Sequence, residues 1–188
     1  MPSCAKRFSP GLFALCLAFG SAPAEAGNYA ARIEYAELQT EGDTATIASQ
    51  IEYRLSPVAK EALDKGVPLT WDVVMELREP GWLWDSVAYR SKQRYRLQFH
   101  ALLNQYAVQT PQNHSEMFLT LSAALHFMAS VRDQQPIPAA ALQPGRYYQL
   151  AVRSEFNREA LPIPLRPMAY LDHRWFLSSH WSLWPIQK

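Results

Sequence analysis

The stretch Leu69-Thr-Trp-Asp-Val-Val-Met-Glu-Leu-Arg78 places a large apolar side chain at every second residue and polar ones at most positions between. This period of two is typical of a β-strand with one buried face. After the break at Glu79-Pro-Gly81 the alternation resumes, and one parity then holds Val87, Tyr89, Tyr95, Leu97 and Phe99. We therefore expect two strands, 67–78 and 87–99, paired as an antiparallel hairpin around which the chain is organised.

The second of these strands carries cations on its other face. Its outward positions are taken by Arg90, Lys92, Arg94 and Arg96. In an antiparallel hairpin Asp72 and Glu76 share this face, and opposite charges across strands stabilise each other by roughly 0.2–1 kcal/mol per pair. Two interpretations are open: a solvated, partly charge-paired surface, or a docking site for an anionic partner.

Alternating segments elsewhere predict further strands. They lie at 29–35, 44–55, 105–110, 146–156 and 175–183. The first is expected to turn Tyr29, Ala31, Ile33 and Tyr35 inward, and the last to turn inward Trp175, Leu177, Trp181 and Leu183. Because no βαβ rhythm is present, the chain is predicted to be mostly β: an antiparallel β-sandwich, Ig-like or similar, of about seven strands, with an open barrel as the second choice.

Two short helices are predicted between strands. Ser56-Pro57 is a typical helix start, because serine caps the amide ends and proline is tolerated at the first helical position. Gly66 suits the residue after the end. The second helix is predicted at 121–132, with a core-facing stripe of Leu121, Leu125, Met128 and Val131. The proline-rich run 161–167 is expected to be extended.

The loop inside the first hairpin contains Trp82 and Trp84 among proline and glycine. Two tryptophans in such a loop either form a lid packed over one end of the core or remain as an exposed aromatic patch. We predict the lid and keep the patch as the alternative.

The first 26 residues have the features of a secretory signal peptide. Lys6 and Arg7 precede an apolar run at 11–19, and Ala24-Glu-Ala26 matches the small-x-small cleavage pattern. We expect a mature periplasmic domain from about residue 27 to 188, with an uncleaved anchor as the alternative. Cys4 and Cys16 both lie in this leader, so a disulfide framework and a cysteine-ligated metal site are not expected.

Charge argues against nucleic acid as a ligand. The 18 basic and 17 acidic residues of the chain become 16 of each once Lys6, Arg7 and Glu25 are removed with the leader. Nucleic-acid binders normally show a strong basic excess.

Residue combinations typical of catalysis are weak. Ser178 or Ser179 with His180 and Asp172 lacks a Gly-x-Ser-x-Gly elbow, and neighbours on one strand point to opposite faces. Asp72 and Glu76 would lie roughly 13 Å apart on one strand, too far for the usual two-carboxylate glycosidase geometry. No His-x-x-x-His or His-Glu-x-x-His spacing occurs among His100, His114, His126, His173 and His180. We predict no enzymatic activity, no cofactor and no metal.

Several short motifs occur in a fixed order along the chain: Tyr53-Arg-Leu-Ser-Pro57, Glu61-Ala-Leu-Asp-Lys-Gly-Val-Pro-Leu69, Trp82 with Trp84, Tyr95-Arg-Leu97, Gln143-Pro-Gly145 and Leu177-Ser-Ser-x-Trp181. In their order and spacing they resemble the domain-of-unknown-function 4390 family of small exported bacterial proteins. The resemblance spans the whole mature chain. It implies an envelope protein, often encoded near a nitrogen-regulation-type sensor kinase, and implies no particular activity.

The first functional hypothesis is therefore a non-catalytic periplasmic interaction domain that presents Arg90, Lys92, Arg94 and Arg96 to an acidic partner, such as the sensory region of a membrane kinase. The rival is a carbohydrate-, lipid- or cell-wall-binding module that uses Trp82 and Trp84.

Overall fold

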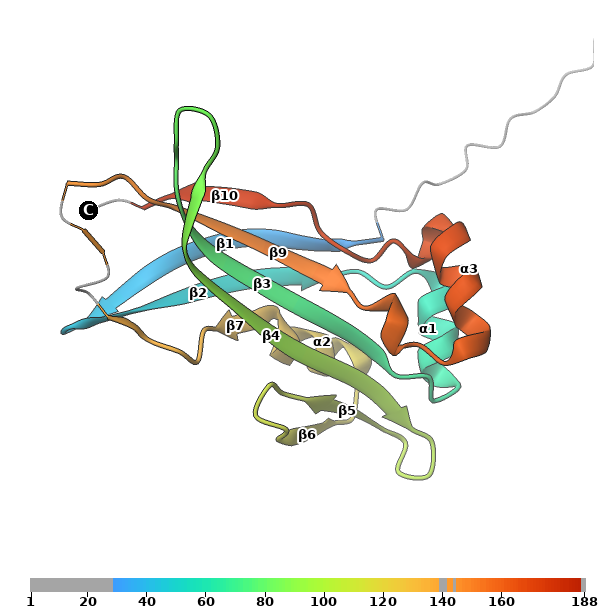
Figure 1. Cartoon of the computed structure of the whole chain (residues 1–188). Coiled ribbons are helices and arrows are strands. Elements are labelled where there is room, and N and C mark those ends of the chain that lie inside the picture. Colours follow the sequence, from blue (N-terminus) through green and yellow to red (C-terminus); the bar gives the residue numbers. More distant parts are fainter. Residues whose placement is uncertain (1–28, 139–141, 144, 187–188) are drawn as a thin grey trace, which may run out of the picture.

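In the computed structural model, which describes residues 29–138, 142–143 and 145–186, strand β3 (Leu69–Glu79) lies inside the larger of two antiparallel sheets. The strand order of this sheet is β10-β9-β3-β4-β5-β6 (Figure 1). Besides β3 it contains β4 (Ser86–His100), β5 (Gln105–Gln109), β6 (Ser115–Phe118), β9 (Gln149–Phe156) and β10 (Ser182–Pro185). The predicted pairing of the first hairpin is confirmed, since Asp72 lies opposite Arg94 and Glu76 opposite Arg90.

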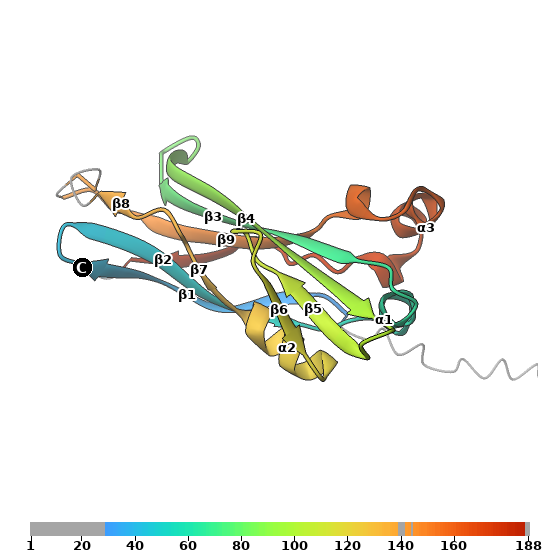
Figure 2. The ribbon, with the colours of Figure 1, turned by 90° about the horizontal axis from the view of Figure 1, so that it is seen from below.

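The smaller sheet is built on a second hairpin. It contains β1 (Ala31–Glu41), β2 (Thr44–Tyr53), β7 (Ser130–Arg132) and β8 (Ile137–Pro138). Both β7 and β8 pair with β2 on the side away from β1. The two sheets lie face to face and do not close into a barrel (Figures 1 and 2), so the prediction of a mostly β, sandwich-like fold is confirmed.

A bulge in β1 corrects one predicted side-chain direction. The register with β2 shifts between Ile33 and Tyr35. Beyond the shift Tyr35 faces solvent and Ala36 takes the buried position. A β-bulge adds one residue to a strand, so it reverses the inward parity of everything that follows.

The core between the sheets centres on Trp71. Its ring contacts Tyr53 at a centroid distance of 5.4 Å and Phe156 at 5.2 Å, and Phe156 continues to Trp175 at 6.1 Å. The indole nitrogen Nε1 donates to the carbonyl oxygen of Leu177 at 3.3 Å. These aromatic residues come from β2, β3, β9 and the C-terminal segment, so the cluster ties distant parts of the chain together.

Both predicted helices form, with one boundary changed. Helix α1 (Pro57–Asp64) begins where Ser56 Oγ accepts the amide of Ala59 at 3.1 Å, and it is followed by Gly66 at φ +85°. Helix α2 (Leu121–Ala129) is shorter than predicted. It ends because Ser130 is extended and 130–132 pair with β2, so Val131 is buried from a strand and not from the helix.

The proline-rich run is extended only at Leu161 and Pro162, and the prediction is wrong for the rest of it. Ile163–Leu165 form a 3-10 turn, and a third helix, α3 (Arg166–Leu171), follows it. Proline lies within the first two positions of each. The missing amide costs little there, since the first amides of a helix have no carbonyl partner within it.

The predicted last strand is also wrong over most of its length. His173–Trp175 form a 3-10 turn, and only Ser182–Pro185 pair with β9. Between them an irregular segment bonds to both sheets: the amide of Ala31 donates to Leu177, and the amide of Ser179 donates to Ser154. Trp175 and Leu177 are buried as expected, whereas Leu183 is exposed.

No helix in the described part of the chain is long and apolar enough to cross a membrane. The predicted leader, residues 1–26, lies outside the described residues.

Trp71 and Trp82 provide a matched test of this core. Replacing Trp71, which is 1% exposed, by alanine should lower the free energy of unfolding by about 3–5 kcal/mol, because a large cavity is left in the aromatic cluster. Trp82→Ala, at a side chain that is 98% exposed, should change it by less than about 0.5 kcal/mol. Urea unfolding monitored by circular dichroism measures both, and equal losses would contradict this core.

Candidate interaction surfaces

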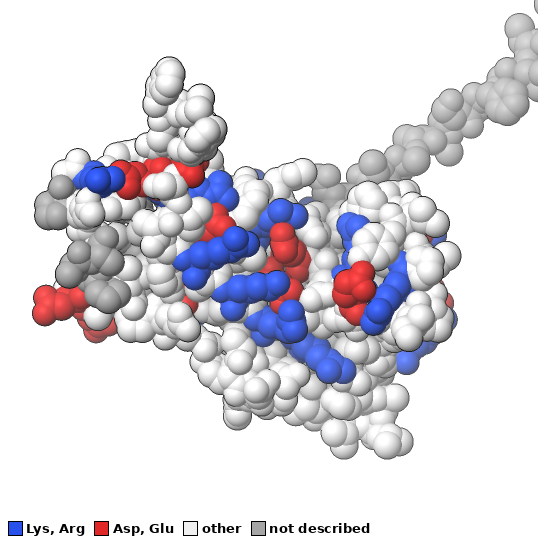
Figure 3. Space-filling model, viewed as in Figure 1, with Lys and Arg blue, Asp and Glu red and all other residues white. Residues whose placement is uncertain are grey.

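The outward face of the larger sheet has charged side chains in rows across three strands. Asp72 lies between Glu155 and Arg94, and Val74 lies between Arg153 and Lys92. We define the cationic face by its cations: Arg78, Arg90, Lys92, Arg94, Arg96 and Arg153. The carboxylates of Asp72, Glu76 and Glu155 lie among them (Figure 3).

Asp72 is held from three sides. Arg94 donates to its two carboxylate oxygens from Nε at 2.7 Å and from Nη2 at 3.2 Å. Lys92 Nζ lies 3.1 Å from Oδ2, and Asn157 Nδ2 donates to the same oxygen at 3.0 Å. Burial by itself raises the pKa of Asp72, but the bonds and charges of Arg94 and Lys92 outweigh it and hold the pKa below its ordinary value of 3.8.

Glu76 is covered in the same way two rows further on. Arg78 donates to Oε2 from Nε at 2.7 Å, and Arg90 Nε lies 3.3 Å from Oε1. Trp181 then stacks on Arg78, with the guanidinium carbon 4.3 Å from the ring centroid. Arginine stems and an aromatic ring thus shield the carboxylate from water.

The charge that this face exposes to solvent therefore differs from the sum of the charges in it. The side chains of Asp72 and Glu76 are only 5% and 4% exposed, whereas those of Arg90 and Arg94 are 63% and 60% exposed. Figure 3 shows the result as a band of cations crossing the middle of this face. Burying the anions beneath the cations leaves a surface that presents positive charge to an approaching molecule.

Arg96 lies at the end of this band. In the described part of the chain its guanidinium has no carboxylate partner, and its polar contact is Gln98 Oε1 at 3.5 Å. It lines a hollow of about 210 Å³ together with Thr70, Arg94, Thr110 and Asn113. The lining includes a hydroxyl from Thr70, an amide from Asn113 and the guanidinium of Arg96, which are donor types that suit a carboxylate.

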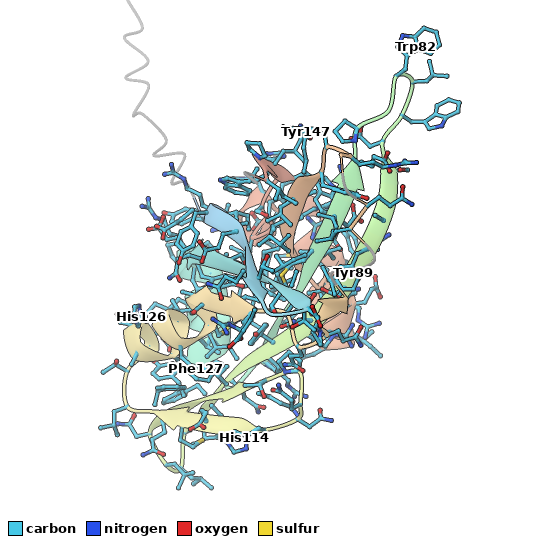
Figure 4. All side chains as sticks on the ribbon, turned by 90° about the vertical axis from the view of Figure 1, so that its left-hand side faces the viewer. Trp82, Tyr89, His114, His126, Phe127 and Tyr147 are labelled. Carbon is cyan, nitrogen blue, oxygen red and sulfur yellow. The ribbon has the colours of Figure 1, made fainter. Side chains whose placement is uncertain are left out.

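The tryptophan loop is not a lid. Trp82 is 98% exposed and Trp84 77% exposed, at the end of an arm that leaves the body of the protein (Figure 4). The pairing of β9 with β3 ends at Arg78, so beyond it the hairpin has no third strand to pack against. We call residues 80–84 the hairpin tip. The prediction of a lid is wrong, and the alternative of an exposed aromatic patch is correct.

Comparison with protein families agrees with the resemblance seen in the motifs. The family model described as "Domain of unknown function (DUF4390)" matches residues 29–185. The chain belongs to this family. No curated protein and no solved structure gives a significant match to this DUF4390 chain.

The residues considered for a serine hydrolase have structural partners in this DUF4390 fold. Ser178 Oγ accepts the amide of Phe156 at 2.9 Å, and Ser179 Oγ accepts the amide of Ser154 at 2.8 Å. Asp172 caps the following turn and pairs with Arg174 at 2.8 Å. The two serines fix the irregular C-terminal segment to β9, and Asp172 stabilises a turn within that segment. Among the described residues no group of three or more His, Cys, Asp and Glu side chains could hold a metal.

Two members of the cationic face were missing from the predicted set. Arg78 shares the parity of Asp72 and Glu76, so the alternation of the first strand already places it there. Arg153 could not be assigned, because nothing in its local pattern shows that β9 pairs with β3.

A buried carboxylate on the inner side was also missed. Asp133 is 4% exposed and accepts the hydroxyl of Tyr89 at 2.8 Å and the amide of Gln93 at 3.2 Å. Burial, with the neighbouring Asp133, raises the pKa of Tyr89 to about 12. The network joins β4 to the chain that follows β7, which is a structural role.

The ion pairs on Asp72 should make stability depend on acid pH. Because its folded-state pKa lies below 3.8, the stabilisation is fully present above that value and is lost as the pH falls through the folded-state pKa. Asp72→Asn should lose about 1–3 kcal/mol near pH 7. The difference between wild type and variant should shrink as the pH falls below about 4.

Urea unfolding across this pH range measures the effect. Glu155→Gln is the control, because its pair with Arg153 is more exposed and should contribute less than about 1 kcal/mol. If Asp72→Asn lost stability at low pH in the same way as the wild type, the ion pairs on Asp72 would not be the source of the acid dependence.

Proposed function

We propose that the chain is an exported, non-catalytic interaction domain of the bacterial cell envelope that binds an acidic protein partner through the cationic face. The observation that carries this proposal is the burial of Asp72 and Glu76 beneath exposed arginine and lysine side chains. A face of this kind attracts and orients an acidic surface while its own anions remain inside.

The charge of the whole domain shows how unusual the cationic face is. With the predicted leader removed, basic and acidic residues are equal in number. The excess of cations over carboxylates on this face is therefore balanced by acidic residues elsewhere, and the domain is electrically polarised. A polarised domain binds in a preferred orientation, because an acidic partner is attracted to this face more strongly than to the rest of the surface taken together.

The hollow beside Arg96 offers the contact where a partner's carboxylate fits best. Arg94 is already bonded to Asp72, whereas Arg96 still has guanidinium donors to give. An acidic side chain entering here gains a bidentate pair with Arg96 and a hydroxyl contact from Thr70, since the Thr110 hydroxyl already donates to the carbonyl of His114.

Membership of the family supports the choice of partner. The resemblance implies frequent proximity of these genes to a sensor kinase, so the periplasmic sensory region of such a kinase is the acidic partner that we propose. The leader at 1–26 supports delivery to the same compartment.

Charge changes on the face test the binding role. Arg90→Gln combined with Arg96→Glu leaves Asp72 and its partners intact, and Glu76 keeps Arg78. The affinity for the purified sensory region should fall by about tenfold or more, and wild-type binding should weaken with added salt. Isothermal titration calorimetry at two salt concentrations measures this.

Arg54→Gln combined with Arg32→Glu is the matched control, since Arg32 is exposed on β1 and Arg54 is exposed directly after β2, both away from the cationic face. The control should bind as wild type does. Equal affinity for the face variant and the wild type would reject the cationic face.

Export is tested separately by protein chemistry. The protein recovered from the periplasmic fraction should begin near Gly27, and Edman sequencing or intact mass establishes its N-terminus. Recovery of a full-length chain from the cytoplasm alone would reject export. An intact leader in the membrane fraction would favour the anchored alternative.

A further inference from the structure

The hairpin tip is an exposed apolar feature that the cationic face does not explain. Trp82 and Trp84 are joined there by Leu83, which is 65% exposed, and residues 80–84 include no charged side chain. Exposing this much aromatic and aliphatic surface to water at the end of an arm is unfavourable unless it has a binding role.

The turn that carries the rings is built tightly. A Cβ placed on Gly81 would lie 2.1 Å from the carbonyl oxygen of Trp84, so the chain folds back on itself within the tip and only glycine fits. Below it, Glu79 pairs with Arg146. The aromatic rings are therefore presented by a closed turn on a braced strand pair, which lowers the entropic cost of binding.

The shape of the tip indicates what it contacts. Figures 1 and 4 show it as a convex projection with solvent on its sides. A folded protein partner would need a matching deep socket, whereas a bilayer deforms around a small wedge. Tryptophan is also the side chain that collects at the water–bilayer interface, because its ring is apolar and its N–H remains hydrogen-bonded.

The direction of the arm adds charge complementarity. Figures 2 and 4 show that it leaves the sandwich on the side of the larger sheet, away from β1 and β2. In the strand register Arg78 and Arg90 are the members of the cationic face nearest the tip. Arg78 is bonded to Glu76 and mostly covered, so Arg90 is the exposed cation that a surface touched by the tip meets first, and it attracts anionic headgroups.

We propose that the hairpin tip inserts into the interfacial region of a lipid bilayer and holds the domain at a membrane that contains anionic lipid. Trp82, Leu83 and Trp84 enter among the headgroups and first acyl carbons, and Arg90, whose side chain is 63% exposed, lies against the phosphates. Glu79 and Asp85 at the base limit the depth. Three apolar side chains give reversible attachment, since stable anchoring needs far more buried hydrocarbon.

This inference goes beyond the proposed partner binding and does not depend on it. The test uses the exported protein with vesicles of phosphatidylcholine, with or without phosphatidylglycerol, in co-sedimentation. Trp82→Ala combined with Trp84→Ala should reduce the bound fraction on both vesicles, with the partition constant falling by about tenfold or more.

Leu102→Ala combined with Leu103→Ala is the matched control. These leucines are 102% and 62% exposed in the β4–β5 turn, away from the tip, and their loss should leave vesicle binding unchanged. A fluorescent probe on Leu83→Cys should shift to shorter wavelength with vesicles, and the same probe on Leu102→Cys should not. Because Trp82 and Trp84 are exposed, both alanine variants are expected to fold.

The two proposals fail separately. The Arg90→Gln, Arg96→Glu variant should bind neutral vesicles as the wild type does. It should not show the increase in binding that phosphatidylglycerol gives the wild type. The tip variant should keep its affinity for the kinase sensory region. Vesicle binding that is unaffected by the tip substitutions would overturn the inference. Binding of peptidoglycan fragments without vesicle binding, or tip-dependent self-association in sedimentation velocity without vesicle binding, would also overturn it.

Discussion

The rest of the structure depends on the covering of strand β3 on both of its faces. One face is apolar and packs against the smaller sheet through Trp71, Val73, Met75 and Leu77. The other carries two carboxylates that no apolar layer could cover without a large desolvation cost. Cations on β4, joined by Arg78 of β3 itself, solve this problem, since each carboxylate receives two of them and is closed off by their aliphatic stems.

This arrangement explains why the outer face of the larger sheet is charged and yet contains buried carboxylates. A row of exposed ion pairs contributes little to stability, because water screens both partners. Here water screens the two partners unequally, because the carboxylates of Asp72 and Glu76 are buried and the arginines above them are exposed. The same contacts that keep Asp72 ionised in the folded protein therefore also determine the sign of the potential on the surface.

The length of the first hairpin has a separate consequence. β3 and β4 continue past the last residue that β9 pairs with, and the smaller sheet gives the tip no cover. Beyond Arg78 the ladder has one more pair, Glu79 with Ser86, and the loop that this pair closes is free to carry side chains that the core could not use. The fold thus separates a polarised face from an apolar tip while leaving both on one side of the molecule.

The sequence by itself determined the strands with long, regular alternation, the capped start of α1 and the outward parity of Arg90, Lys92, Arg94 and Arg96. These features follow from local chemistry, which the neighbouring residues of the chain define. Only the tertiary structure decided that Trp82 and Trp84 are exposed, that Arg153 joins the cationic face and that the bulge at Ile33 turns Tyr35 outward. Each of these depends on where another strand ends or pairs, and strand pairing joins residues far apart in the sequence whose local patterns carry no record of one another.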